Sequence, residues 1–273
     1  MRKSIPRKAR PVKRVEEPRI ELPTKPSEPR RSLADYSMLL YGREKVGKTT
    51  LAAQFPDALF FMCEPGGRSL RIMQVGIHNW HQFLDALKQV NASERFRTVV
   101  LDTVDLAFRF CEAYVCKRLG IEHPSDEEWG KGWGMVRDEF ALAMAELINV
   151  EGRGTIFVSH AMETELRRRT GQTSHRTAPT MANQARAVLE PMVDIWAYYA
   201  YSPEGARTLR IRGDDQVAAG CRVEGHFLDP KGDGIAEIPM GRSAAEAYYN
   251  YVTAFNNESA PRSKKLIKIR RKG

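Results

Sequence analysis

One eight-residue segment, Gly42–Thr49, constrains the fold of this 273-residue chain more than any other feature. It reads GREKVGKT and matches the phosphate-binding pattern GxxxxGK[ST] without a mismatch. The pattern works between a buried strand and a helix, because its glycines let backbone N–H groups wrap phosphates and the helix N-terminus adds a favourable dipole. An apolar run, Ser37–Tyr41, precedes the segment, and a helical stretch from Lys48 to about Gln54 follows it. The sequence therefore predicts a nucleotide-phosphate site.

We expect the residues of this loop to bind a nucleotide together with Mg²⁺. We expect the Lys48 ammonium group to reach the β- and γ-phosphates, and the Thr49 hydroxyl to bind the magnesium ion. The chain has no guanine-reading N-K-x-D motif, which fits ATP without deciding between ATP and GTP. The residues expected to line the nucleotide are Gly42, Arg43, Glu44, Lys45, Val46, Gly47, Lys48, Thr49 and Thr50.

Two carboxylates follow apolar runs further along the chain. Asp102 comes directly after Thr98–Leu101, at the strand edge where ligands of open α/β sheets bind, and we expect it to hold Mg²⁺ through water. A helix-capping role is compatible with this assignment, although Asp105 fits the cap better. Glu64 follows Ala58–Cys63 and can polarise the attacking water, provided that its strand neighbours the strand of the phosphate loop. The alternative for Glu64 is a solvated loop residue.

A histidine ends a further apolar run. His160 follows Thr155–Ser159, where its ring can hydrogen-bond the γ-phosphate and report its presence to the segment behind it. A capped polar residue at a strand end is the alternative.

Apolar runs of strand length alternate with helical stretches through the middle of the chain. This alternation predicts an α/β fold with a mostly parallel, twisted sheet flanked by helices. Besides the segments above, we expect a strand at Val193–Ala200 that forms a hairpin with Arg207–Arg212, and helices at Trp80–Val90, about Leu106–Leu119, Gly134–Val150, Met181–Leu189 and Ala244–Phe255.

Positive charge is concentrated at the two ends of the chain. The net charge is +9, yet residues 1–31 hold 11 Lys/Arg against 4 Asp/Glu, residues 260–273 hold 7 against none, and the middle is left at −5. We expect a disordered, Pro-rich basic arm at 1–31, one folded domain at 32–257 and a basic tail at 258–273. Such arms suit nucleic acid, because each neutralised phosphate releases counterions. Solubilising tails are the alternative.

The sequence also indicates a compartment. We find no signal peptide and no apolar run of membrane-spanning length, so we expect no membrane contact. Four cysteines without a disulfide-scaffold spacing fit a reducing cytoplasm. Cys111, Cys116 and His123 lack an evident fourth zinc ligand, which favours buried structural cysteines.

The order of these motifs resembles the RecA-like recombinase core, and within it the bacteriophage ATPases of the single-strand annealing or recombination type. The likeness extends over about residues 35–256 and is strong at three segments, namely FFMCEPGG (60–67), DEEWGKGW (126–133) and IFVSH (156–160). It implies an ATP- and Mg²⁺-dependent ATPase that acts on single-stranded DNA as a homo-oligomeric ring or filament. The residues implied as catalytic are Lys48, Glu64, Asp102 and His160.

In the RecA-like core two mobile loops face DNA, and the matching stretches here are residues 122–133 and 161–180. Aromatic side chains beside cations suit single-stranded DNA, because bases stack and phosphates pair. Core packing is the alternative for the tryptophans, and a solvated loop is the alternative for the arginines. The residues expected to contact DNA are Trp129, Lys131, Trp133, Arg167, Arg168, Arg169 and Arg176.

The resemblance departs from the family pattern at one point. Family members often carry a Lys-Asp-Arg-like triplet after the hairpin, which reaches the nucleotide of a neighbouring subunit. This chain has Gly220-Cys221-Arg222, so only Arg222 matches as a trans-acting residue.

Two other functions remain open. An AAA+-type helicase-loading or remodelling ATPase needs a helical lid domain, whereas residues 201–257 are predicted to form a hairpin, loops and one helix. The other is a nucleotide-dependent module that coats DNA with negligible hydrolysis. A single-strand DNA-binding protein is the alternative partner for the basic tail.

Overall fold

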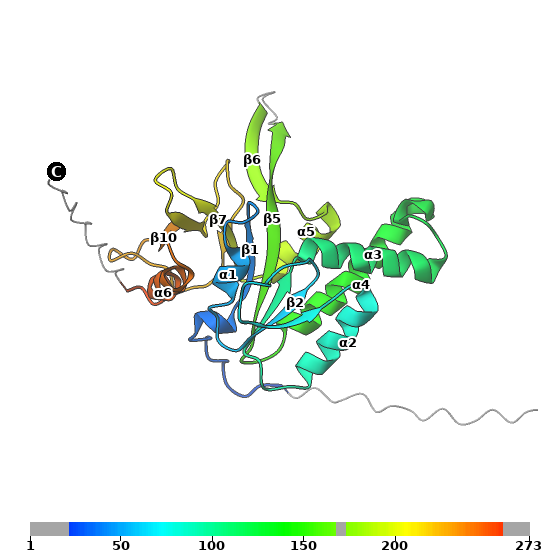
Figure 1. Cartoon of the computed structure of the whole chain (residues 1–273), viewed down its shortest axis with the longest axis horizontal. Coiled ribbons are helices and arrows are strands. Elements are labelled where there is room, and N and C mark those ends of the chain that lie inside the picture. Colours follow the sequence, from blue (N-terminus) through cyan, green and yellow to red (C-terminus); the bar gives the residue numbers. More distant parts are fainter. Residues whose placement is uncertain (1–21, 168–172, 259–273) are drawn as a thin grey trace, which may run out of the picture.

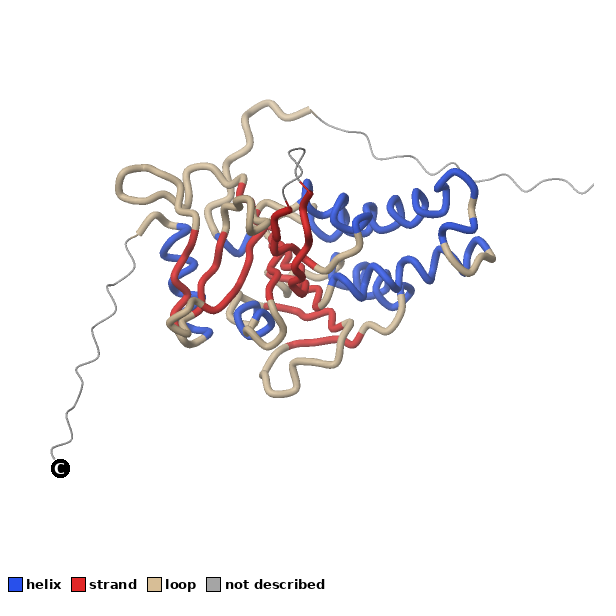
Figure 2. Tube along the Cα trace, turned by 90° about the horizontal axis from the view of Figure 1, so that it is seen from above, coloured by secondary structure: helices blue, strands red, loops and turns tan. Residues whose placement is uncertain are grey.

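A ten-stranded sheet runs through the middle of the part of the chain that the computed structural model describes, residues 22–167 and 173–258 (Figures 1 and 2). The strand order is β10-β8-β7-β1-β5-β4-β2-β3, with β6 paired to β5 and β9 paired to β7. Helices α2 to α5 pack on one face, and α1 and α6 pack on the other. The expected α/β fold with a mostly parallel sheet flanked by helices is confirmed.

The centre of the sheet is parallel and buried. Every residue of β1 and of β4 is buried, as expected for strands with helices on both faces, which appear in the sequence as continuous apolar runs. The six strands with parallel neighbours are β1 (Ser37–Gly42), β2 (Ala58–Met62), β3 (Met73–Gly76), β4 (Thr98–Asp102), β5 (Gly154–Arg167) and β7 (Ile195–Tyr201).

Antiparallel strands extend this centre in two places. At one edge, β8 (Arg207–Arg210) and β10 (Glu237–Gly241) continue the sheet beyond β7, and β9 (Gly220–Cys221) also pairs with β7. In the middle, β5 pairs with β1 up to His160 and with β6 (Thr173–Pro179) from Ala161 onward. This β5–β6 pair rises out of the sheet as an arm (Figure 1), and "the arm" denotes it below.

Two apolar clusters, one on each face, hold the helices on the sheet. The larger cluster includes a group of packed aromatic rings in which Trp80, Phe108 and Phe140 are almost fully buried. The six helices of the described chain are α1 (Lys48–Ala52), α2 (Trp80–Asn91), α3 (Val104–Leu119), α4 (Lys131–Ile148), α5 (Asn183–Met192) and α6 (Ala244–Phe255). None of them is long and apolar enough to cross a membrane.

The predicted elements are present, whereas β3, β9 and β10 were not predicted, and three predicted features differ. Helix α3 begins at Val104 rather than near Leu106, so that Asp105 lies inside the first turn and Thr103 occupies the N-cap position; the capping role predicted for Asp105 is wrong. Helix α4 begins at Lys131, because the left-handed backbone of Gly130 separates it from the preceding 3-10 turn. Residues 161–167 and 173–179 form the arm, where a loop was expected.

This group of aromatic rings gives a stability prediction. Phe140 is fully buried, and its ring centroid lies 5.1 Å from that of Phe108 and 6.1 Å from that of Trp80. Replacing Phe140 by Ala should lower the free energy of unfolding by about 3–5 kcal/mol, because the cavity it leaves loses both transfer and packing energy. Urea unfolding followed by circular dichroism measures the loss. The control is Leu142→Ala two residues away, since Leu142 is 73% exposed and should cost little; equal losses would contradict the packing described.

Candidate nucleotide-binding site

The phosphate loop joins β1 to α1 at the carboxyl edge of the sheet. Gly47 has φ of 103°, a left-handed conformation that a glycine adopts without strain, and α1 begins directly after it at Lys48. The Lys48 side chain is buried, and its Nζ donates hydrogen bonds to the carbonyl oxygens of Gly42 (2.8 Å) and Arg43 (2.9 Å). Burial lowers the pKa of Lys48, and the nearby carboxylate of Asp102 opposes that shift. The ammonium group thus lies inside the loop that would surround the phosphates.

The end of β1 requires a glycine for a packing reason. A Cβ atom at Gly42 would lie 2.1 Å from the carbonyl oxygen of Tyr199 on the adjacent strand β7. The first glycine of the motif therefore permits close contact between β1 and β7, in addition to starting the loop.

Thr49 and Asp102 meet beneath the loop. The Thr49 hydroxyl donates a hydrogen bond of 2.6 Å to Asp102 Oδ2, and Asp102 is only 6% exposed. Burial raises the pKa of Asp102, and the hydrogen bond from Thr49 opposes this. A hydroxyl and a carboxylate are oxygen ligands of the kind that Mg²⁺ prefers, so this pair fits the predicted metal site.

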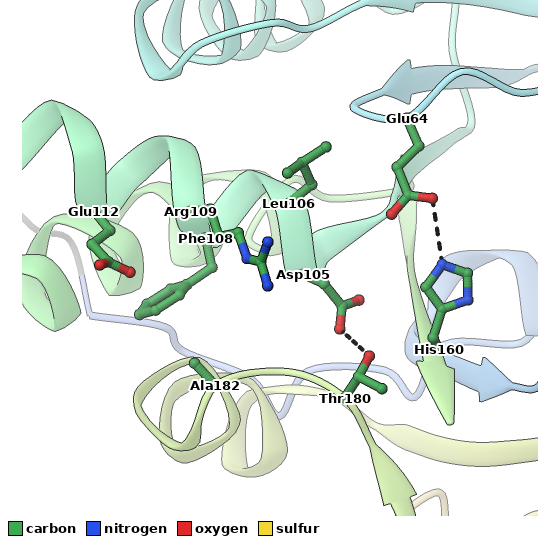
Figure 3. A pocket seen from close by; sticks show the side chains of 9 residues that line it. All are labelled: Glu64, Asp105, Leu106, Phe108, Arg109, Glu112, His160, Thr180 and Ala182. Atoms are coloured by element: carbon green, nitrogen blue, oxygen red, sulfur yellow. Dashed lines mark hydrogen bonds and ion pairs between the residues drawn. The ribbon is translucent and has the colours of Figure 1, made fainter. Parts of the chain in front are cut away.

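Glu64 is held at the edge of the sheet by two neighbours. The Thr103 hydroxyl donates to Glu64 Oε1, and His160 Nε2 lies 3.3 Å from Glu64 Oε2 (Figure 3). The predicted role of Glu64 required its strand to neighbour the strand of the phosphate loop. This condition is not met, because β5 and β4 lie between β1 and β2. Glu64 is instead positioned through the β2–β4 pair, in which the Cys63 N–H bonds the Asp102 carbonyl at 2.8 Å. It is therefore not a freely solvated loop residue.

A cavity of about 400 Å³ opens beside Glu64 (Figure 3). Asp105 lies on its wall, and its Oδ1 accepts hydrogen bonds from the hydroxyls of Ser159 (3.1 Å) and Thr180. The Thr180 N–H also donates to the His160 carbonyl at 3.0 Å, which closes the base of the arm. Asp105 and Thr180 were missed as partners because 75 residues separate them in the sequence.

Arg207 is a second residue that the sequence did not reveal. It begins β8, and its Nε donates to the carbonyl oxygen of Val46 in the phosphate loop at 2.8 Å. The other guanidinium nitrogens donate to the Arg242 carbonyl and to the Tyr201 hydroxyl. Arg207 thus fixes the outer side of the loop to the antiparallel edge of the sheet.

The residues predicted to contact DNA fall in two places. Arg176 lies on β6 and Arg167 ends β5, both in the arm, whereas Arg168 and Arg169 fall outside the described residues. Trp129 lies in the turn between α3 and α4, and Lys131 and Trp133 lie in the first turn of α4. The two tryptophans differ, because Trp129 is 93% exposed whereas Trp133 packs partly against the core.

The predicted trans-acting Arg222 makes contacts within its own chain. Its Nε lies 3.0 Å from Asp194 Oδ1, and its two Nη atoms donate to the carbonyls of Pro191 and Met192. These bonds would have to break for Arg222 to reach a neighbour.

A protein family described as "AAA domain" matches residues 34–223, a span that contains the loop and all the site residues above. The chain belongs to this family. It is also similar to the SPbeta prophage-derived uncharacterized protein YorG of Bacillus subtilis (strain 168), with 29% identity over 131 residues. That match covers 45% of this chain and 40% of the length of YorG.

Two solved structures resemble this AAA domain at low sequence identity. A KaiC-like protein from Pyrococcus horikoshii OT3 has a TM-score of 0.46 and 15% identity, covering 78% of this chain and 88% of that one. The RadB recombinase has a TM-score of 0.45 and 12% identity, covering 79% of this chain and 90% of that one.

The Arg207 contact gives a prediction for this AAA domain. Replacing Arg207 by Met removes its charge-assisted bond to the loop carbonyl of Val46 and should weaken ATP binding about tenfold or more, since such a bond contributes about 1.5–3 kcal/mol. The dissociation constant of a fluorescent ATP analogue measures this loss. The matched control is Arg210→Met on the same strand, whose guanidinium pairs with Asp214 and Glu237 instead. Equal affinities of the Arg207 variant and the unaltered protein for the ATP analogue would show that Arg207 does not hold the phosphate loop in its binding conformation.

Proposed function

We propose that this chain is a RecA-like ATPase that acts on single-stranded DNA in phage-type recombination or strand annealing. The observation that carries the proposal is the contact between Glu64 and His160, which joins the catalytic edge of the sheet to the base of the arm. The membership of the chain in an AAA domain family and its similarity to a prophage-derived protein support a nucleotide-driven role in a phage setting.

ATP would bind with its phosphates in the loop. The Lys48 ammonium would exchange its two carbonyl partners for phosphate oxygens, which offer full negative charge in place of a dipole. Thr49 and Asp102 would hold Mg²⁺, which when bound neutralises charge on the phosphates. Backbone N–H groups at the start of α1 add to this stabilisation.

Glu64 is the candidate general base. Thr103 bonds one carboxylate oxygen and His160 approaches the other, so the orientation of the carboxylate is fixed before a substrate arrives. A carboxylate in this position would accept the proton of the attacking water, a role that typically accelerates a reaction by about 10²–10⁴-fold. The adjacent cavity gives water room to reach Glu64.

The arm would carry the signal of nucleotide state to DNA. His160 is the last β5 residue paired with β1, and Ala161 is the first paired with β6, so the ring lies where the arm leaves the sheet. A weaker second link is the exposed ion pair of Arg43 with Glu163, at 3.7 Å. The sequence places Arg167, Arg168, Arg169 and Arg176 along this segment, and they would pair with DNA phosphates.

The alternative functions make different demands. The described residues after α5 form β7 to β10 and the single helix α6, which does not provide the helical lid of a AAA+-type remodelling ATPase. A DNA-coating module without hydrolysis would bind ATP but not turn it over. Steady-state turnover with and without single-stranded DNA distinguishes that module from the proposed ATPase, for which we expect DNA to raise the rate.

The general-base assignment gives a mutational prediction. Glu64→Gln should lower ATP turnover about 100-fold or more while leaving ATP affinity unchanged, because the amide cannot accept the proton. The control is Glu112→Gln, which alters another carboxylate on the wall of the same cavity (Figure 3) and should turn over ATP normally. Lys48→Ala should differ from both by losing ATP binding itself. An unchanged rate for Glu64→Gln would remove Glu64 from the mechanism.

A further inference from the structure

The turn between α3 and α4 presents an isolated tryptophan at one end of the molecule. This segment, residues 121–130, is called the Trp129 turn below. Trp129 is 93% exposed, and its backbone has φ of 60° and ψ of 23°, a left-handed conformation that bulky residues rarely adopt. Large aromatic side chains exposed in this way are typical of the anchor residues of protein interfaces.

The Trp129 turn is a fixed structure. The Asp126 carboxylate accepts hydrogen bonds from the backbone N–H groups of Glu122 and His123, at 3.1 and 2.8 Å. Below it, Trp133 Nε1 donates to Ser125 Oγ at 3.2 Å, and the Trp133 ring meets the edge of the His123 ring at 5.4 Å. An anchor presented by a preformed turn loses little conformational entropy when a partner binds.

The charge of the Trp129 turn selects the chemistry of that partner. Residues 121–130 contain no Lys or Arg, and Lys131 is the first basic residue after them. Acidic side chains repel a phosphate backbone and attract cations, and the face of an indole ring also attracts Lys and Arg. The four acidic residues of the turn are Glu122, Asp126, Glu127 and Glu128.

We propose that the Trp129 turn binds the basic segment 259–273 of a second copy of this chain. That segment holds seven Lys/Arg and no Asp/Glu, with Leu266, Ile267 and Ile269 set among the charges. Its aliphatic side chains would pack on the Trp129 ring while its cations pair with the surrounding carboxylates. The basic segment and the acidic turn are therefore complementary in charge, and both carry apolar side chains that can pack together.

The placement of the two partners indicates a second copy rather than the same one. Helix α6, after which residues 259–273 follow, and the turn between α3 and α4 lie at opposite ends of the molecule in both views (Figures 1 and 2). A contact between opposite ends of two copies is a head-to-tail contact, which can repeat along a chain of subunits or close into a ring.

A labelled peptide tests the contact directly. Fluorescein-labelled peptide 259–273 is titrated with the full-length chain at low protein concentration, and fluorescence anisotropy gives the dissociation constant. We expect saturable binding that weakens about tenfold or more for Trp129→Ala, as truncation of an interface anchor does. Trp129→Phe should retain most of the affinity, and Tyr249→Ala, which removes another exposed aromatic ring on α6, should not change it. Equal affinity for Trp129→Ala and the unaltered chain would overturn the proposal.

Two further measurements separate this contact from simple charge attraction and from DNA binding. A peptide with Leu266, Ile267 and Ile269 replaced by Ser keeps all seven charges and should bind about tenfold more weakly; undiminished binding would contradict packing on Trp129. Acrylamide quenching reports mainly Trp129, which is 93% exposed, because Trp80 and Trp196 are buried and Trp133 is only partly exposed. The unlabelled peptide 259–273 should reduce the quenching of Trp129, and oligothymidylate should not. The reverse result would assign the turn to nucleic acid and overturn the proposal.

The full chain must also show the contact between copies. Sedimentation velocity should give a mean mass that rises with protein concentration, and Trp129→Ala should abolish the rise while leaving the unfolding midpoint unchanged. A chain that stays monomeric at concentrations where the peptide saturates the turn would exclude the second copy as the occupant.

Discussion

The proposed function depends on one interaction, the contact of Glu64 with His160. Glu64 follows β2 and His160 lies on β5, two strands separated by β4, and the twisted parallel sheet brings their side chains to within 3.3 Å at its carboxyl edge. Thr103 holds the other oxygen of the same carboxylate, so Glu64 is connected both to the end of β4, where Asp102 is the proposed Mg²⁺ ligand, and to the arm. A change at the phosphates therefore has a short physical route to the segment that would meet DNA. Two discrete arrangements of this contact would be enough to couple the two sites.

Much of this site could be predicted from the sequence because its parts are local. A glycine-rich loop between a buried strand and a helix, and Asp102 at the end of an apolar run, are each visible within about ten residues. The pairing of Thr49 with Asp102 followed from both lying at the same edge of the sheet. By contrast, the order of the strands is a property of the whole chain, and the adjacency of the Glu64 strand and the loop strand, set as a condition for the role of Glu64, is not met.

The residues that were missed act across long distances in the sequence. Arg207 reaches Val46, and Thr180 reaches Asp105, through side chains that follow no motif. The arm was taken for a loop because charged and small polar residues dominate the sequence of its strands, so hydrophobic alternation did not reveal them. The Trp129 turn was interpreted as a DNA-facing loop because of its Trp and the nearby Lys131. Its exposed side chains, apart from Trp129, are mainly acidic, which disfavours contact with DNA. Residues 161–179 hold four Arg against two Glu, so DNA suits that segment, whereas the acidic turn suits a basic peptide.

The most direct test of this account is the reciprocal coupling between ATP and single-stranded DNA. In the unaltered protein, a non-hydrolysable ATP analogue should change the affinity for single-stranded DNA by about fivefold or more, and DNA should change the affinity for the analogue by the same factor, as linkage requires. His160→Ala should leave each ligand able to bind alone and should bring both factors to about one, because it removes the link between Glu64 and the arm. Coupling that survives undiminished in His160→Ala would show that the signal does not pass through this contact.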